Sequence, residues 1–165
     1  MGFDVEAEPP LRSAVTNRHG PVYEDECVEL FWQGDAPEGD YLEIVVNPAG
    51  TLYAARVLNP EGSRATWRVS PGAEPKGLSV RIAGEPVGTP PEERLRWSAE
   101  ISLPWGSLPG SGTLPAPGTL LRGNLFRIAR GRSTRFEGLS PTLRASPPDF
   151  HVPARFAYFL IPSLI

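Results

Sequence analysis

The densest group of chemically active side chains is an acidic run, Glu24, Asp25 and Glu26, followed three residues later by Glu29. Carboxylate oxygens are the ligands that Ca²⁺ prefers, so these four residues form a candidate metal site. The run lacks the glycine-turned loop of an EF-hand, and consecutive residues of a strand point to opposite faces. The sequence therefore favours a solvated acidic patch over a calcium site.

Catalysis is not indicated by any motif. His151 lies two residues after Asp149, but a nucleophilic triad also needs a poised Ser or Cys, and no nucleophile-elbow motif occurs. The single cysteine, Cys27, lies in a predicted strand and is expected to be buried and inert. Carboxylates are plentiful, yet none is singled out as one of a glycosidase pair. We therefore predict no catalytic residue, and a structural role for His151 in which its ring bonds to a neighbouring loop and fixes the last strand.

Charge and hydropathy exclude several classes of partner. The formal net charge is −3, from 16 basic and 19 acidic residues, whereas nucleic-acid binding through phosphates needs a basic face. No apolar run reaches the roughly 18 residues of a membrane span. The segment Met1–Glu8 is acidic and has no apolar signal stretch, so the compartment is not determined. A single cysteine excludes an intrachain disulfide and a multi-cysteine metal site, and no cofactor is predicted.

Short strands joined by turns are the secondary structure that the sequence favours. The chain contains 20 Pro and 17 Gly, which interrupt helices because Pro removes a backbone donor and Gly is costly to order. Side chains alternate between apolar and polar with a period of two, as in half-buried strands. We expect strands over Glu26–Trp32, Tyr41–Val46, Thr51–Val57, Leu78–Ala83, Trp97–Leu103, Leu120–Ala129 and Arg155–Ile161, and one helical turn over Pro90–Arg96.

These elements predict an all-β fold, an antiparallel β-sandwich of the jelly-roll kind, for one domain that spans residues 1–165. Trp32, Trp97 and Trp105 are expected to fill the core. In the first predicted strand, Val28, Leu30 and Trp32 share one face, and Cys27, Glu29 and Phe31 share the other. Because successive strand residues point to opposite faces, one ring and several charges are expected on an open sheet surface beside a buried apolar side.

Three segments follow one another in a distinctive order and spacing. They are PVYEDECVELFW followed by YLEIVVNPAGTLY, then WSAEISLPWGSL, and finally LRGNLFRIAR followed by LSPT and DFHVPARFAYFLI. Together they resemble the family 9 carbohydrate-binding modules and their relatives in the DOMON-like group. The resemblance covers most of the chain and implies a β-sandwich with a non-catalytic carbohydrate-binding function. It also implies an association with glycoside hydrolysis or polysaccharide breakdown in bacteria, frequent location outside the cytoplasm, and structural calcium in some members.

The resemblance also implies a set of ligand-binding residues. Members of the family clamp a sugar between two Trp rings, and the first ring corresponds to Tyr23 in this sequence. The acidic sugar-contacting residue corresponds to Glu29, and a basic one to Arg56. The second ring falls near Leu139, where no aromatic residue is present, and Phe136 is a nearby substitute.

Strand alternation adds further candidates, each with a structural alternative. Asn124 and Arg127 could line the sugar face, or satisfy polar groups across the sheet. Trp67 lies in the polar stretch GSRATWRVS and is either a ligand platform or a core residue. Glu29 and Glu43 either accept hydrogen bonds from sugar hydroxyls or pair with arginines on the sheet surface, namely Arg127, Arg122 or Arg56.

The N-terminus bears on assembly, because related domains have two or three more strands before the position of Phe3. The stretch FDVEAE resembles the end of such a strand, so we expect a sandwich that lacks its first strands. An exposed sheet edge offers unpaired backbone groups, which predicts a homodimer through that edge. Two other functions stay open: a structural or interaction β-sandwich that has lost its sugar site, and a haem-binding relative with only His19, His151 and Met1 as axial ligands.

Overall fold

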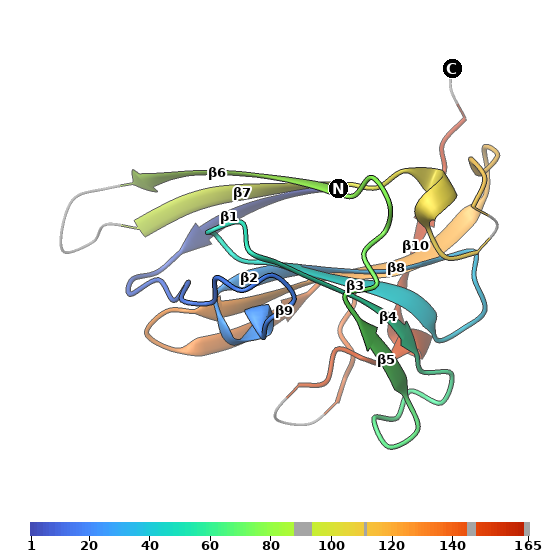
Figure 1. Cartoon of the computed structure of the whole chain (residues 1–165), viewed down its shortest axis with the longest axis horizontal. Helices are drawn as coiled ribbons and strands as arrows, with labels where there is room; N and C mark the ends of the chain where they lie inside the picture. The colour runs from blue at the N-terminus through green and yellow to red at the C-terminus, as the bar shows by residue number, and fades with distance from the viewer. Residues whose placement is uncertain (88–93, 111, 145–147, 164–165) are drawn as a thin grey trace.

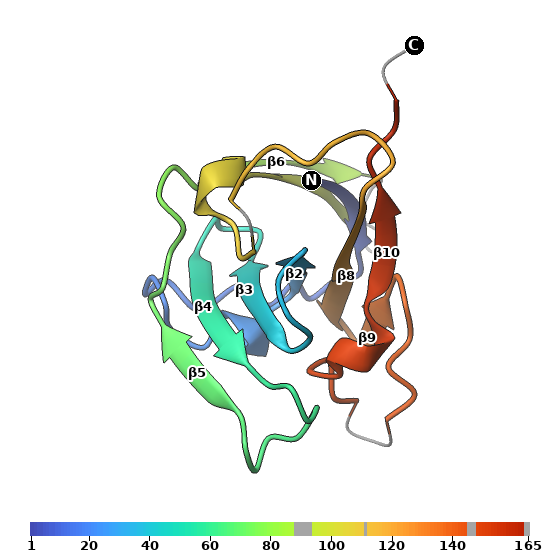
Figure 2. The ribbon, with the colours of Figure 1, turned by 90° about the vertical axis from the view of Figure 1, so that its right-hand side faces the viewer.

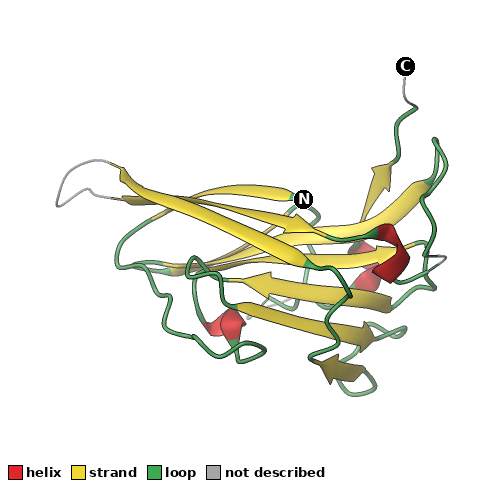
Figure 3. Cartoon of the chain, turned by 45° about the horizontal axis from the view of Figure 1, so that its top comes forward, coloured by secondary structure: helices red, strands yellow, loops and turns green. Residues whose placement is uncertain are grey.

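The computed structural model describes residues 1–87, 94–110, 112–144 and 148–163. Strands are the main elements of these residues, joined by loops and three short 3₁₀ turns, as Figure 3 shows. The strands are β1 (Gly2–Ala7), β2 (Cys27–Gly34), β3 (Asp40–Val46), β4 (Leu52–Leu58), β5 (Arg68–Pro71), β6 (Ser79–Val87), β7 (Arg94–Ser102), β8 (Leu120–Arg130), β9 (Thr134–Gly138) and β10 (Ala157–Leu160). The turns are η1 (Val22–Glu24), η2 (Trp105–Ser107) and η3 (Pro153–Arg155).

Two antiparallel sheets form the fold. The smaller sheet has the order β1-β7-β6, and the larger has the order β10-β8-β2-β3-β4-β5 with β9 paired to β8. Figure 1 shows the small sheet as a layer above the large one, and Figure 2 shows the same two layers from the end. This arrangement confirms the predicted all-β sandwich. No helix in the described part of the chain has the length and apolar character needed to cross a membrane.

The main core fills the space between the two sheets. Its larger members, Leu30, Ile44, Trp97 and Ile101, are buried and belong to one apolar cluster. Trp32 is also buried in this cluster, and Trp105 packs against it from η2. The period-two alternation that predicted inward-facing residues in β2 and β7 is therefore confirmed, since residues of one parity meet between the layers.

The opposite face of the large sheet carries a second apolar layer. There Phe31, Tyr41, Val57, Phe126 and Phe156 form one buried cluster. Every residue of β2 is consequently buried, including those on the face that was expected to be open. The segment around Phe150 and Phe156 packs over part of this face. The expected open sheet surface is thus partly covered by the chain itself.

Three strands depart from the sequence expectations. Residues Gly2–Ala7 lie outside the strands expected from alternation and pair with β7 along their whole length, with Val5 opposite Trp97. Strand β5 is four residues long, and every position of β9 is exposed, so neither shows an alternating apolar pattern. The expected helical turn over Pro90–Arg96 is wrong at its end, because Arg94–Arg96 belong to β7; residues 90–93 lie outside the described residues.

Candidate functional site

A pocket of about 420 Å³ opens on the outer face of the large sheet. We call it the aromatic pocket, because side-chain rings make up much of its wall. The rings belong to Tyr23, Tyr53, Trp67, Phe136, Phe150 and His151. Its charged or ionisable lining also includes Glu29, Glu43, Arg64 and Arg130. Ligand sites of proteins combine apolar walls with a few polar groups in this way.

The two carboxyl groups come from the adjacent strands β2 and β3. Glu29 lies opposite Val45, and Glu43 lies opposite Phe31. They are therefore diagonal neighbours on one face of the sheet, a relationship that separates residues by about 7–8 Å. Only 2% of Glu29 and 6% of Glu43 is exposed. Two adjacent strands of the sheet thus place the buried side chains of Glu29 and Glu43 in the wall of the pocket.

Burial changes the protonation of both acids. It raises the pKa of Glu29 to about 8, with the charge of Glu43 as the second cause. Burial likewise raises the pKa of Glu43 to about 7, against the opposing charge of Arg64. An isolated carboxylate is poorly solvated in such a place, so the neutral form is favoured. Near neutral pH the pocket therefore holds at least one protonated carboxyl group, which can donate as well as accept a hydrogen bond.

His151 completes the base of the pocket. Its Nδ1 lies 2.8 Å from the hydroxyl of Tyr41, and its Nε2 lies 3.8 Å from Oε1 of Glu43. Burial is the main reason that the pKa of His151 falls to about 3, so the ring is neutral at ordinary pH. We predicted a bond from this ring to a neighbouring loop, which is wrong, because the partner Tyr41 belongs to β3.

The rings of the wall are held by contacts with one another. Tyr23, on η1, is 44% exposed and meets Tyr53 edge-on with 6.0 Å between ring centroids. Phe136, on β9, is 37% exposed and lies edge-on to Phe150 at 6.0 Å. Trp67 is half-buried, and its ring lies edge-on to His151 at 4.7 Å. Half-exposed rings held at an edge leave apolar surface available to a ligand.

The two arginines of the pocket are engaged by other groups. Arg64 donates to Asp149 with Nη2 and Oδ1 2.9 Å apart, and its guanidinium lies 4.9 Å from the Trp67 ring centre. Arg130 donates to the carbonyl oxygen of Tyr23 at 3.3 Å and lies 5.9 Å from the ring centre of Phe136. Arg130 thus connects the backbone of Tyr23 with the ring of Phe136 at the rim of the pocket.

Of the six ligand-binding candidates, three lie together and three lie elsewhere. Tyr23, Glu29 and Trp67 all line the aromatic pocket, as does the suggested substitute Phe136. Trp67 also packs against the second apolar layer. Leu139, at the place of the family's second ring, does not line it.

Arg56, Asn124 and Arg127 have structural partners outside the pocket. Arg56 makes two hydrogen bonds of 2.7 Å to the carboxylate of Asp40. Asn124 is buried and binds Ser140, donating to its carbonyl and accepting from its amide. Arg127 donates to Glu26 at 2.9 Å. The expectation that Tyr23, Glu29 and Arg56 converge on one surface is therefore wrong for Arg56.

The acidic run is not a solvated patch, which corrects the sequence interpretation. Asp25, Glu26 and Glu29 are buried, and only Glu24 is exposed. Asp25 accepts hydrogen bonds from the amide of Val15 and the side chain of Asn47. Glu26 accepts from the Arg127 side chain and from the amide of Arg130. In the described ranges, no three His, Cys, Asp or Glu side chains are grouped to hold a metal ion.

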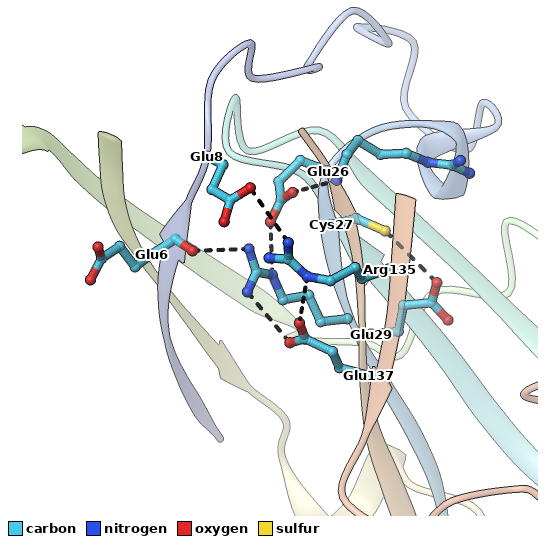
Figure 4. Close-up of polar contacts among 9 residues, drawn as sticks. Glu6, Glu8, Glu26, Cys27, Glu29, Arg135 and Glu137 are labelled. Atoms are coloured by element: carbon cyan, nitrogen blue, oxygen red, sulfur yellow. Dashed lines mark hydrogen bonds and ion pairs between the residues drawn. The ribbon is translucent and has the colours of Figure 1, made fainter. Parts of the chain in front are cut away.

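Figure 4 shows the contacts of Glu26 and of its neighbours on β1 and β9. Arg127 bridges Glu26, Glu137 and the carbonyl of Glu6, and so ties the large sheet to β1. The same view includes Cys27, which is buried as expected, with its Sγ 3.8 Å from Oε1 of Glu29. The proposed pairing of Glu29 or Glu43 with surface arginines is wrong, since Arg127, Arg122 and Arg56 pair with other acids.

Several pocket residues were not singled out from the sequence. Tyr53 follows the alternation of β4 and could have been placed on the outer face from that pattern. Arg64, Arg130 and Phe150 lie at loops or strand ends, where period-two alternation gives no direction. Their position depends on contacts between segments far apart in the chain.

Comparisons with known proteins give one match, in structure. No family model matches the sequence, and no curated protein is significantly similar. The fold resembles the crystal structure of a proposed carbohydrate-binding protein from Bacteroides uniformis, with a TM-score of 0.65 and 22% sequence identity. The match covers 95% of this chain and 70% of that one. At this level of identity, the likeness shows a shared fold.

Proposed function

We propose that this chain is a non-catalytic carbohydrate-binding domain whose ligand occupies the aromatic pocket. The observation that carries the proposal is the meeting of half-exposed rings with two nearly buried carboxyl groups in one cavity. The apolar C–H faces of a pyranose pack on aromatic rings, while carboxyl groups hydrogen-bond to its hydroxyls. The shared fold with a proposed carbohydrate-binding protein supports the same conclusion.

The finer assignment is a domain of the family 9 type within the DOMON-like group, spanning residues 1–165 and serving polysaccharide breakdown in bacteria. Three sequence segments and the β-sandwich support it. In this proposal Tyr23 acts as the first ring of a sugar clamp, and Phe136 takes the role of the absent second ring. Arg130 supports this pairing because it contacts the backbone of Tyr23 and the ring of Phe136.

Calorimetric titration with a panel of mono- and disaccharides tests the proposal. One aromatic platform with a few polar contacts predicts dissociation constants on the order of micromolar to millimolar. The substitution Tyr23→Ala should weaken binding, whereas Tyr158→Ala removes an exposed ring on β10, away from the pocket, and should not. A folded chain that binds no sugar of the panel would favour the alternative function, a structural or interaction sandwich.

A second candidate function is glycoside hydrolysis, which the carboxyl pair itself favours. Glycosidases use two carboxyl groups on one cleft, and Glu29 and Glu43 both line the aromatic pocket. We propose the non-catalytic function because no catalytic motif accompanies the pair in the sequence and the fold is shared with a proposed carbohydrate-binding protein. Incubation with aryl glycosides should give no product. Turnover that disappears in Glu29→Gln would establish an enzyme instead.

A further inference from the structure

Glu29 and Glu43 differ from the other buried acids of the described residues in their lack of partners. Four carboxylate side chains are buried there: Asp25, Glu26, Glu29 and Glu43. Asp25 and Glu26 each accept two or more hydrogen bonds from amide or cationic groups. Each of these two acids therefore has amide or cationic donors of its own, although Oδ1 of Asp25 accepts no hydrogen bond.

The carboxyl groups of Glu29 and Glu43 have few hydrogen-bond partners among the described residues. Among the described residues, Glu29 accepts one hydrogen bond, from the thiol of Cys27, with Sγ and Oε1 3.8 Å apart. Within the described part of the chain, the nearest charged or polar contact of Glu43 is Nε2 of His151 at 3.8 Å, beyond hydrogen-bond distance. Burying a carboxyl group without partners is costly, and both groups line the cavity. Their unused hydrogen-bonding capacity is thus directed at whatever fills the pocket.

The two arginines that line the pocket each donate to groups other than Glu29 and Glu43. Arg64 is bound to Asp149, and Arg130 is bound to the Tyr23 carbonyl and to Thr134. His151 is neutral at ordinary pH. Trp67 and Tyr53 line the pocket, and the Trp67 ring already carries the Arg64 guanidinium 4.9 Å from its centre, which shows that the aromatic wall accepts a cation. Arg64 acts on Glu29 and Glu43 through its charge, but it donates to Asp149, so a cationic donor in direct contact with the carboxyl pair would have to come from the ligand.

We propose that the aromatic pocket prefers a sugar with a free primary ammonium group, a hexosamine of the glucosamine type. Its ammonium group would donate to Glu29 and Glu43, while its ring carbons lie against the aromatic wall. An ammonium group has three donors and forms charge-assisted bonds with carboxylates. This inference rests on the proposed carbohydrate-binding function and specifies the ligand class of the same site.

Binding of the ammonium group should release protons. Because an adjacent cation favours the ionised form of a carboxyl group, Glu29 and Glu43 lose protons to solvent as the ligand binds. The other titratable or charged groups around the pair are Tyr23, Cys27, Tyr41, Tyr53, Arg64, Arg130, Asp149 and His151. Cys27, Tyr41 and Tyr53 stay protonated because burial raises the pKa of each.

Calorimetry with three ligands of one ring type separates charge from shape. Glucosamine carries the ammonium group, N-acetylglucosamine has the same nitrogen without charge, and glucose has a hydroxyl in its place. At about pH 6.5, where the acids are mostly protonated, we expect glucosamine to bind on the order of tenfold more tightly than either neutral sugar. Its heat of binding should vary with the ionisation enthalpy of the buffer, as proton release requires, whereas that of glucose should not.

The matched variants are Glu29→Gln with Glu43→Gln, and the exposed control Glu24→Gln. The double variant should reduce the affinity ratio of glucosamine to glucose towards one, and the control should keep it. Proton release is measured on the unaltered chain, so it decides the inference even where the double variant does not fold. Equal affinities for glucosamine and glucose would overturn this inference and leave the proposed function standing. Absence of binding by all three sugars and by the wider panel would overturn the proposed function itself.

Discussion

The hydroxyl oxygen of Tyr41 and Nδ1 of His151 lie 2.8 Å apart in the buried base of the aromatic pocket. Tyr41 belongs to β3, and His151 follows it by 110 residues in the segment that covers the outer face of the large sheet. Phe31 packs against both rings, at centroid distances of 5.5 Å from Tyr41 and 4.8 Å from His151. This contact fixes the covering segment on the sheet and so defines the shape of the pocket.

We predict that Tyr41→Phe lowers the free energy of unfolding by about 1–3 kcal/mol, because it leaves the buried Nδ1 of His151 without its partner. Urea denaturation measures the loss. The control Tyr158→Phe removes a hydroxyl from an exposed ring and should change stability by less than about 0.5 kcal/mol. Equal stability of the two variants would mean that the Tyr41–His151 bond does not hold the segment in place.

The buried pair of Glu26 and Arg127 should contribute strongly to stability. Glu26 is fully enclosed and accepts from Arg127 at 2.9 Å and from the amide of Arg130 at 2.7 Å. Arg127 keeps Glu137 and the Glu6 carbonyl as partners, but Glu26→Gln replaces one acceptor oxygen of a buried carboxylate by an amide group, so it should cost about 1–3 kcal/mol in thermal or chemical unfolding. The neighbouring change Glu24→Gln, at an exposed site, should cost little. A small effect of Glu26→Gln would argue against its buried position.

Stability should fall as the pH rises towards about 8. A carboxyl group whose pKa is higher in the folded than in the unfolded chain binds more protons when folded, so stability declines from the unfolded pKa up to the folded pKa and levels off above it. The ordinary value of 4.5 and the folded values of about 8 for Glu29 and about 7 for Glu43 set these limits. Over the upper part of this range, from about pH 6.5, we expect a loss of roughly 2 kcal/mol, at about 1.4 kcal/mol per proton and pH unit.

Urea denaturation across this window checks the pH prediction. His151 acts in the opposite sense and at lower pH, because its lowered pKa destabilises the fold as pH falls below its ordinary value of 6.5. The double variant Glu29→Gln, Glu43→Gln should show a flat profile between about pH 6.5 and 8.5. A decline of the same size in that variant would assign the effect to other groups.

The proposed role of Phe136 in sugar binding is also testable. Phe136 lines the pocket, whereas Leu139 is 58% exposed outside it. We predict that Phe136→Ala weakens sugar binding by about 3- to 10-fold, the usual effect of losing one aromatic contact. Leu139→Ala should leave the affinity unchanged. The reverse order of effects in calorimetric titration would move the clamp towards the position of Leu139.

The fold was largely predictable because it depends on local alternation. The strands β2, β3 and β7 contain apolar residues at every second position, and the sandwich buries those residues between its sheets. Strand β9 escaped prediction because all its side chains are exposed, so no hydrophobic period marks it. Its pairing with β8 is made by the backbone, which any sequence can provide.

The site was predictable only in part, because distant residues decide which polar groups are free. Glu26 and Glu29 look alike in sequence, yet Glu26 is neutralised by Arg127, which lies 101 residues away. Arg56 resembled a ligand residue, but Asp40 is its diagonal neighbour across β3 and β4 and takes both of its donors. Strand alternation predicts the sheet face on which a side chain lies, but it does not predict which residue binds that side chain.

The most direct test of carbohydrate binding in the aromatic pocket is a ¹H–¹⁵N spectrum of the four tryptophan indole groups during a sugar titration. Trp67 lines the pocket, whereas Trp32 and Trp97 are buried between the sheets and Trp105 packs against that core. We predict that the indole signal of Trp67 shifts in a saturable manner while those of Trp32, Trp97 and Trp105 stay in place. An unchanged Trp67 signal at saturating sugar, or a shift confined to another tryptophan, would contradict the proposed site.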